Sequence, residues 1–285
     1  MSLELVVPER LPVRAGGERL DHLSPSSIEL FYSCPEAWRR RYLLRERWPR
    51  SGAMHLGSSV DEAVSGYFRS RLGGLELPAA DVLETYREAW RWGLAQEEVR
   101  FEADQKPGAL LDAGARLVGL YLDQVAPAVQ GVIGVQRRIE FRLAPGLAWT
   151  VIGFMDVECE ALIVDLKTKA KHLTSAQAGD SLQAGTYLLA RRMEGRPAHA
   201  FQFHSLAHGL KEPGVRVVET RRTAGQLDTV LARIALAATH IVGLAERFGP
   251  QATWPLASPD NWRCSARFCG AYGRCVGGLA LARAA

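Results

Sequence analysis

The sequence has few cysteines, little net charge and no long apolar run. None of its apolar runs approaches the length of a membrane span, which argues against an integral membrane protein. The five cysteines are an odd number and follow no signal peptide, so we expect a reducing, cytoplasmic setting and not a disulfide framework. No G-x-x-x-x-G-K-[ST] motif is present either, which excludes a P-loop motor protein.

Length and local patterning predict one compact α/β domain. With 285 residues the chain can bury a sizeable core. Helical periodicity dominates a first portion, strands alternate with helices in a second, and a Gly-Pro pair at 249–250 precedes a short tail. We therefore expect a single domain over 1–285. It should contain a helical N-terminal portion (24–125), a core with a mixed central sheet flanked by helices (130–248) and a cysteine-bearing C-terminal tail (249–285).

The individual elements can be placed more closely. Ser24 before Pro25 is typical of a helix start, which puts Cys34 at or just beyond the end of that helix, before Pro35. A second helical segment should reach about residue 44. Beyond it we expect helices over 54–70, 80–97, 107–124, 176–193 and 224–247, and strands over 132–142, 148–158, 161–167, 198–206 and 215–221.

Two acids and a lysine stand out in the strand region. Asp156 ends one apolar run and Asp165 ends the next, so the two carboxylates should lie on neighbouring strands. Asp165 and Lys167 are two residues apart and share one face of a strand, while Val164 and Leu166 turn to the core. Acids that hold a hard cation beside an ammonium suit phosphate chemistry. Taken alone, Asp-x-Lys is also common in ordinary strands as an ion pair.

These residues, in this order, resemble the motifs of the PD-(D/E)XK superfamily, in particular its RecB-like exonuclease branch, which includes CRISPR-associated adaptation nucleases and phage exonucleases. The resemblance extends from about Leu23 to Cys275 and implies a restriction-endonuclease-like core. Asp156 and Asp165 match the two acids, although glutamate is commoner at the second position, and Lys167 matches the lysine. Gln183 and Tyr187 match the branch's Q-x-x-x-Y motif, and their spacing puts them on one helix face.

The resemblance also implies a metal site and an activity. His55 matches a histidine that the branch uses as a metal ligand, and the backbone carbonyl of Leu166 would join Asp156 and Asp165 in holding Mg2+ or Mn2+. The implied function is a metal-dependent exonuclease acting on single-stranded DNA or DNA ends in recombination, repair or CRISPR-type processing. Expected partners are DNA and a helicase, a recombinase or a CRISPR protein. The alternative is a non-catalytic DNA-binding or assembly subunit that retains the nuclease fold.

The cysteines form a second pattern. Cys264, Cys269 and Cys275 follow the spacing C-x4-C-x5-C, and in a reducing setting metal binding is the natural explanation. RecB-like nucleases with an iron-sulfur cluster place a further cysteine near the N-terminus, and Cys34 matches it, so the resemblance implies a 4Fe-4S cluster on these four thiolates. The gap between Cys264 and Cys269 is four residues long, whereas a gap of two residues is commonest in that branch. Because of this difference, zinc bound by the four thiolates remains an alternative. Cys159 is left as a free thiol.

Basic residues gather in two places. Arg39, Arg40 and Arg41 lie with further arginines among tryptophan and tyrosine residues, a pattern that suits contact with phosphates and stacking on bases. A solvated helix face with inward-facing aromatics explains the same pattern equally well. Lys169 leads directly out of the strand that carries Asp165 and is a candidate to grip the DNA backbone.

Overall fold

The computed structural model describes residues 10–144, 148–209, 211–258 and 260–277. Its contacts divide the chain into two compact units. The first unit combines Met1–Trp48, Ile139–Gly153 and Ala224–Ala285, and the second combines Pro49–Arg138 and Phe154–Thr223. Each unit therefore joins segments that are far apart in the sequence. Neither unit coincides with one of the three portions (24–125, 130–248 and 249–285) expected from the sequence.

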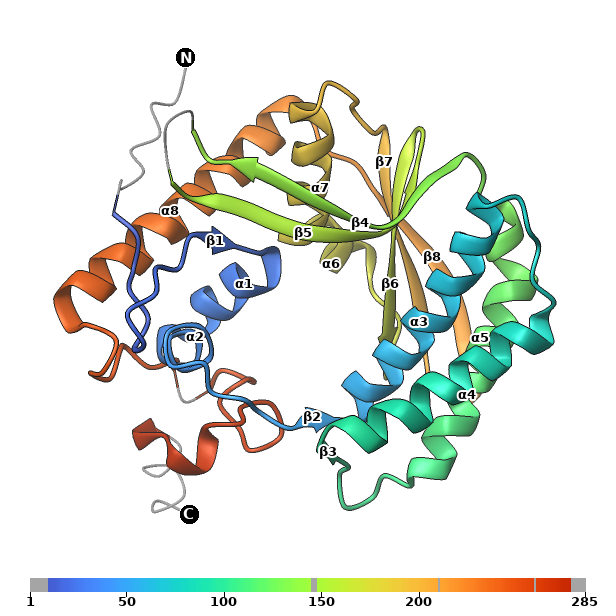
Figure 1. The fold of residues 1–285 in the computed structure, drawn as a ribbon, viewed down its shortest axis with the longest axis horizontal. Coiled ribbons are helices and arrows are strands. Elements are labelled where there is room, and N and C mark those ends of the chain that lie inside the picture. The colour runs from blue at the N-terminus through green and yellow to red at the C-terminus, as the bar shows by residue number, and fades with distance from the viewer. Residues whose placement is uncertain (1–9, 145–147, 210, 259, 278–285) are drawn as a thin grey trace. The chain divides into compact units, whose positions relative to one another are not determined.

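A mixed β-sheet forms the centre of the second unit (Figure 1). β6 (Leu162–Lys169) pairs antiparallel with β5 (Thr150–Cys159) and parallel with β7 (Ala200–Ala207), which in turn pairs antiparallel with β8 (Gly214–Thr220). β4 (Val132–Arg142) is hydrogen-bonded to β5. The mixed central sheet with helices on both sides confirms the predicted α/β fold class.

The parallel pair β6 and β7 requires a crossover connection, and α6 (Ser175–Gly179) and α7 (Leu182–Met193) supply it. The sequence predicted one helix over 176–193 here. The helix is interrupted because the Ser181 hydroxyl accepts a hydrogen bond from the Ala184 N–H at 3.2 Å and so caps a new helix. The break starts α7 anew directly before Gln183, a residue of the candidate site.

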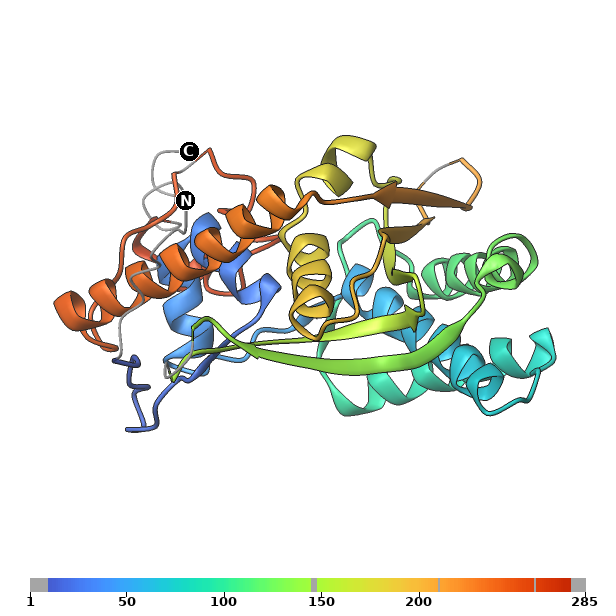
Figure 2. The same ribbon diagram turned by 90° about the horizontal axis from the view of Figure 1, so that it is seen from above.

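Three longer helices pack on the sheet on the side away from α7, as Figures 1 and 2 show. They are α3 (Gly52–Leu72), α4 (Ala79–Gln96) and α5 (Pro107–Gln124). Apolar side chains at helical spacing on α3 meet those of α4, α5 and the sheet in one buried cluster that includes Leu56, Val60, Val64, Phe68, Tyr86, Trp90, Leu117, Tyr121, Val157, Val164 and Leu166. Each such side chain contributes roughly 1.5–3 kcal/mol when buried.

Three short elements complete the second unit. β2 (Arg50–Ser51) and β3 (Val99–Arg100) form a separate parallel pair beside the start of α3 and the end of α4. The 3-10 turn η1 (Ala126–Ala128) follows α5. The carbonyl of Ala126 in that turn accepts a hydrogen bond from the Arg71 guanidinium at 3.0 Å, which ties η1 to the last turn of α3.

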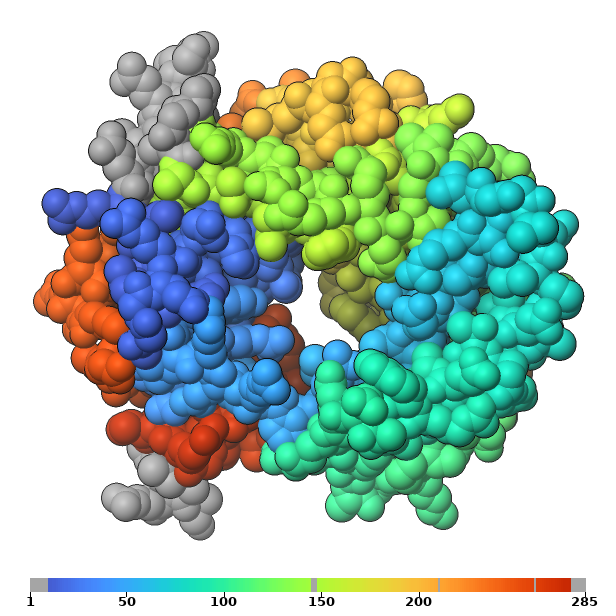
Figure 3. Space-filling view, in the orientation of Figure 1, coloured from blue at the N-terminus to red at the C-terminus, as the bar shows by residue number. Residues whose placement is uncertain are grey.

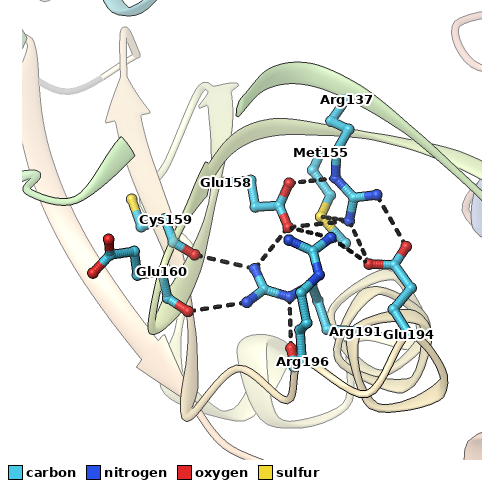
Figure 4. A network of polar contacts seen from close by, with 8 residues as sticks. All are labelled: Arg137, Met155, Glu158, Cys159, Glu160, Arg191, Glu194 and Arg196. Carbon is cyan, nitrogen blue, oxygen red and sulfur yellow. Dashed lines mark hydrogen bonds and ion pairs between the residues drawn. The ribbon is translucent and has the colours of Figure 1, made fainter. Parts of the chain in front are cut away.

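A buried ion-pair network fixes the turn between β5 and β6 (Figure 4). Glu158 is almost fully buried, and its carboxylate accepts hydrogen bonds from Arg191 at 2.7 Å and from Arg137. Arg191 also donates to the carbonyls of Cys159 (3.1 Å) and Glu160 (2.9 Å), the residues at the turn. The network therefore joins α7 to the strand pair that carries both motif acids.

The first unit is built from α1 (Pro25–Ser33), α2 (Pro35–Tyr42), α8 (Ala224–Phe248) and the tail, with the 3-10 turn η2 (Tyr272–Arg274). β1 (His22–Leu23) pairs there with the first residues of β5. In Figures 1 and 3 the tail (red) lies directly against α2 (blue).

A tryptophan pair and a buried glutamate join the tail to α2. The rings of Trp38 and Trp254 stack with their centroids 5.7 Å apart. The buried Glu36 carboxylate accepts hydrogen bonds from Arg39 at 2.7 and 2.8 Å and from the Trp254 N–H at 2.9 Å. A charged group that is buried and fully bonded in this way holds helix and tail together.

α8 is the one helix in the described part of the chain that is long and apolar enough to cross a membrane, judged by length and composition only. By this criterion one apolar segment does reach the length of a membrane span, contrary to the expectation from the sequence. Core helices of water-soluble proteins pass the same test, and α8 buries a regular face that includes Leu227, Val230, Ile234, Ala238 and Ile241. It packs against α1, where the Tyr32 hydroxyl donates to the Arg233 carbonyl at 2.8 Å.

Most predicted elements are present with small shifts of their ends. The helix expected over 107–124 and the strand expected over 132–142 have those bounds in α5 and β4. Ser24 caps α1 through a capping box with Ser27, as its position before a proline suggests. Cys34 ends α1 and caps α2, which places its thiol at the junction of the two helices.

We predict that Glu158→Gln lowers the free energy of unfolding by about 3 kcal/mol or more, because it removes the negative partner of a buried arginine. The matched control is Glu84→Gln on α4, where Arg87 and Arg91 make exposed ion pairs that solvent screens and that should change stability little. Urea unfolding of the three proteins checks the prediction. An equal loss in both variants would show that the network of Figure 4 does not stabilise the fold.

Candidate active site

The two motif acids meet on adjacent strands. Val157 of β5 pairs with Val164 of β6, so the same antiparallel register carried one step further places Asp156 opposite Asp165. The Asp156 carboxylate accepts a hydrogen bond from the backbone N–H of Leu166 at 2.7 Å. This bond fixes the orientation of Asp156 against β6, and the expectation that the two carboxylates occupy neighbouring strands is confirmed.

Lys167, Asp165 and Gln183 form a closed triangle of contacts. The Lys167 ammonium lies 2.7 Å from one oxygen of Asp165 and donates to the Gln183 carbonyl oxygen at 2.8 Å. The Gln183 amide nitrogen donates to the other oxygen of Asp165 at 2.6 Å. Asp165 and Lys167 thus share a strand face, as their spacing predicts, and α7 holds both in place through one side chain.

Tyr187 lies one turn after Gln183 on the same face of α7. Its hydroxyl accepts a hydrogen bond from the backbone N–H of Phe154 at 3.2 Å, two residues before Asp156. Burial raises the pKa of Tyr187 to about 12, and the Asp165 carboxylate adds to the shift. Tyr187 is therefore a neutral hydrogen-bonding group that joins α7 to β5 beside the acids.

A third carboxylate, Asp61 on α3, joins this group, and the sequence analysis missed it. The Gln136 amide nitrogen on β4 donates to both oxygens of Asp61 at 3.2 Å and to Asp156 at 3.4 Å. Gln136 has a φ of 51°, in the left-handed region that few residues other than glycine adopt. Strained backbone of this kind collects at functional sites. The signal in the sequence was weak, because Asp61 and Gln136 match no motif.

Burial and neighbouring negative charge raise the pKa values of two of the acids, Asp156 and Asp61. Burial raises the pKa of Asp156 well above its ordinary value, and the charges of Asp165 and Asp61 add to the shift. Burial, and next the charge of Asp165, raise the pKa of Asp61 to about 6. Burial alone would lower the pKa of Lys167, but the neighbouring Asp165 outweighs it and raises that pKa. One ammonium is thus set against three carboxylates, and the site favours a further cation.

The chemistry of these donors fits a hard divalent cation. Carboxylate and carbonyl oxygens are the ligands that Mg2+ and Mn2+ take in proteins, and Asp61, Asp156 and Asp165 supply carboxylates beside the backbone of Leu166. In the arrangement described for residues 10–277 outside the gaps, no group of three or more His, Cys, Asp or Glu side chains is close enough to hold a metal ion. Gln136 and Lys167 bond to the carboxylates in this arrangement.

His55 lies elsewhere on α3, and its placement argues against the ligand role expected from the resemblance. Its Nε2 atom is 3.1 Å from the Trp90 carbonyl, and its ring packs on the Trp90 ring with centroids 4.4 Å apart. It lines a cleft of about 480 Å³ between α3 and α4, and none of the acids of the candidate site lines that cleft. Six residues separate His55 from Asp61, which turns the two side chains to different sides of the helix.

The arginines predicted to contact DNA have different surroundings. Arg39 is buried with only 3 % of its surface exposed and is bonded to Glu36, so the interpretation that it contacts phosphate is corrected. Arg40 is half-buried and ion-paired with Glu36 and Glu46 at 2.7 and 3.0 Å. Only Arg41 of the three is exposed. Arg39 and Arg40 belong to a buried ion-pair network around Glu36, which is a third explanation beside the two considered from the sequence.

The four cysteines assigned to a cluster all belong to the first unit. Cys34 lies at the junction of α1 and α2, and Asn261 donates to the neighbouring Ser33 carbonyl at 3.3 Å, which brings the tail to that junction. Burial raises the pKa of Cys269, and the charges of Cys34, Cys275 and Cys264 add to the shift, so the four thiols lie within electrostatic range of one another. Cys159 belongs instead to the buried core of the second unit.

Comparisons with known proteins place the chain in a family. The sequence profile of the PD-(D/E)XK nuclease superfamily matches residues 22–276. No curated protein sequence matches. A crystal structure from Eubacterium rectale, described as that of a "Putative exonuclease", has 15% sequence identity and a TM-score of 0.53, with 78% of this chain and 80% of that chain covered.

The match with a second crystal structure, that of SSO0001, covers 89% of this chain and 96% of that chain at 11% identity. Its TM-score of 0.37 is too low to support an argument about fold or function. The Eubacterium rectale likeness shows the fold alone at this identity. The match of the profile covers nearly the whole chain and includes both acids, Lys167, Gln183 and Tyr187. This chain therefore belongs to the PD-(D/E)XK nuclease superfamily.

Proposed function

We propose that this protein is a divalent-metal-dependent deoxyribonuclease, and specifically an exonuclease that hydrolyses single-stranded DNA or DNA ends. The observation that carries the proposal is the contact triangle of Asp165, Lys167 and Gln183 beside Asp156. An intact set of two acids and a lysine argues against the alternative of a non-catalytic subunit, because a degenerate site should have lost at least one of them. The Eubacterium rectale protein is described as a "Putative exonuclease", which agrees with the proposed activity.

The residues of the site have distinct roles in this proposal. Asp156, Asp165 and Asp61, with the carbonyl of Leu166, would hold Mg2+ or Mn2+, which would supply positive charge to the phosphate in the transition state. Lys167 would donate to the attacking water or to a phosphate oxygen. Gln183 keeps the ammonium of Lys167 beside Asp165 and thereby fixes where its protons point.

Tyr187 acts through the backbone and not on the substrate. Its hydroxyl holds the Phe154 N–H, and this bond positions the end of β5 that carries Asp156. The negative charge of the carboxylates repels a phosphodiester when no cation is bound. Binding of a cation and approach of the phosphate are therefore coupled by electrostatics.

The resemblance to the RecB-like branch supports a setting in recombination, repair or CRISPR-type DNA processing in the cytoplasm. The chain has no P-loop motif, so either a partner such as a helicase, a recombinase or a CRISPR protein would separate the strands, or the substrate is already single-stranded or has ends. Lys169 at the end of β6 is our candidate for a contact with the DNA backbone, since it is exposed two residues beyond Lys167.

We also propose that Cys34, Cys264, Cys269 and Cys275 bind a 4Fe-4S cluster, with zinc as the alternative ion. Support comes from the resemblance and from Cys264 and Cys269, whose pKa values are raised by burial and then by the charges of the neighbouring thiols. Such a cluster would close nearly the whole chain into one loop and hold α1 and α2 against the tail. Cross-links that close long loops are expected to stabilise most, because they restrict the unfolded chain most.

Replacement of Lys167 by alanine should lower DNA hydrolysis by about 100-fold or more, because one preorganised charge donor is lost. The assay is digestion of 5'- and 3'-labelled single- and double-stranded DNA with Mn2+, which also distinguishes exonuclease from endonuclease action. Lys106→Ala is the matched control, since Lys106 is an exposed lysine before α5. Digestion by Lys167→Ala at the parent rate would refute the proposed mechanism.

Asp61→Asn should raise the Mn2+ concentration needed for half-maximal hydrolysis by about 10-fold or more, since removal of even an indirect metal partner costs about that much. Glu62→Gln is the control, because Glu62 is the next residue on α3 but is exposed and paired with Arg69. His55→Gln should leave the metal requirement unchanged. If His55→Gln raised the Mn2+ concentration needed for half-maximal hydrolysis and Asp61→Asn did not, the ligand set expected from the resemblance, with His55 and without Asp61, would be supported instead.

Cys34→Ser should lose its metal, together with solubility and thermal stability, whereas Cys159→Ser should keep it. The cause is that Cys34 lies near the tail thiols and Cys159 lies in the other unit. Iron and zinc analysis of proteins purified without oxygen is the measurement, and it separates the cluster from the zinc alternative. Full iron content in Cys34→Ser, or loss of iron in Cys159→Ser, contradicts the assignment.

A further inference from the structure

Two large aromatic side chains of the tail are exposed as a packed pair. Trp262 and Phe268 expose 61% and 52% of their surface, and their rings meet edge to face with centroids 4.9 Å apart. Single exposed apolar residues are common on proteins, but a contiguous exposed pair is a sign of a binding surface. The tail lies at the surface in the view of Figure 3 (red).

An arginine guanidinium lies over each ring of the pair. The Arg263 guanidinium lies 4.8 Å from the centre of the Trp262 ring, and that of Arg267 lies 5.3 Å from the centre of the Phe268 ring. A guanidinium over an aromatic face is attracted to the ring and held in a defined position. Aromatic faces and positive groups therefore alternate across this surface, which we name the tail patch (Trp262, Arg263, Arg267 and Phe268).

The backbone beneath the tail patch is ordered by short hydrogen bonds. The Asn261 side chain donates to the Ser33 carbonyl at 3.3 Å and accepts from the Arg263 N–H at 3.0 Å. The Cys269 N–H donates to the Ser265 carbonyl at 2.9 Å, which closes the loop between Cys264 and Cys269 into a turn. Arg267 and Phe268 thus belong to the four-residue segment between Cys264 and Cys269, which is longer than the usual first gap of the cysteine pattern.

Positive charge and a further aromatic ring continue next to the tail patch. The Trp48 side chain fills the space where a side chain at Gly270 would stand, and the Arg41 guanidinium lies 5.9 Å from the centre of the Trp48 ring. Arg41 is exposed, unlike Arg39. The exposed part of the basic and aromatic segment at 39–48 therefore lies beside the tail.

We propose that the tail patch binds an unpaired nucleic-acid strand, with bases stacked on Trp262 and Phe268 and phosphates bonded to Arg263 and Arg267. Unpaired bases expose their faces for stacking, whereas those of a duplex are already stacked on each other. The alternation of rings and guanidiniums matches the alternation of base and phosphate along a strand. The inference rests on the proposed function, since it supplies a non-catalytic hold on the DNA that the site hydrolyses.

The test measures binding apart from cleavage. Lys167→Ala protein, with no divalent metal added, is titrated into a fluorescein-labelled 20-mer of thymidylate, and anisotropy reports binding. Adding Trp262→Ala and Phe268→Ala should raise the dissociation constant by about tenfold or more. Adding Arg263→Gln and Arg267→Gln should reduce the slope of log affinity against log salt by about 0.7 for each phosphate that is no longer bound. Binding of a duplex of the same length should change much less.

The matched control is Trp92→Ala, which removes an equally exposed tryptophan from α4 in the other unit and should leave binding unchanged. The variant with Trp262→Ala and Phe268→Ala could lose metal or structure. In that case the variant with Arg263→Gln and Arg267→Gln, which keeps both rings, decides whether the tail patch binds DNA. Unchanged affinity and salt slope in the arginine variant overturn the tail patch. Hydrolysis by the parent protein distinguishes failure of the tail-patch proposal from failure of the proposed nuclease function. If the parent digests DNA while the tail variants bind DNA normally, only the tail-patch proposal is refuted. A parent that neither binds nor digests DNA refutes both.

Discussion

Repulsion among three partly buried carboxylates is the constraint on which the second unit depends. Asp61, Asp156 and Asp165 come from a helix and two strands that pack together because of their apolar faces. The apolar core therefore forces together charges that would separate in water. Charge held close in this way destabilises the protein unless donors or a cation offset it. The polar side chains around the acids follow from that requirement.

The donors near the acids come from three elements, β6, α7 and β4. Lys167 extends from the same strand as Asp165, Gln183 reaches in from α7, and Gln136 reaches in from β4 with an unfavourable backbone conformation. The Leu166 N–H adds a fourth donor to Asp156. These four groups carry only one full positive charge, so the offset is incomplete. An incomplete offset is what a site needs if a divalent cation is to bind with a gain in free energy.

The sequence predicted local features well and tertiary ones poorly. Strand alternation placed Asp165 and Lys167 on one face, and helical spacing placed Gln183 and Tyr187 on another, because both patterns depend only on neighbours in the chain. Asp61 escaped notice because its role depends on how α3 packs on the sheet, and no local pattern records that. The buried environment of Arg39 likewise depends on the distant tail, whose Trp254 N–H shares Glu36 with it.

Two acids of this protein show how burial can serve structure or function. Burial would raise the pKa of Glu36, but the bonds from Arg39, the Trp254 N–H and Arg40 outweigh it and hold that pKa below its ordinary value. Burial of Asp156 is instead reinforced by Asp165 and Asp61, so its pKa lies well above the ordinary value. Glu36 is already satisfied and needs no ligand, and it serves to join helix to tail. Asp156 reaches comparable stability only with added positive charge, and that difference supports placing the proposed metal site at the carboxylates on β5 and β6 and not at the carboxylate on α2.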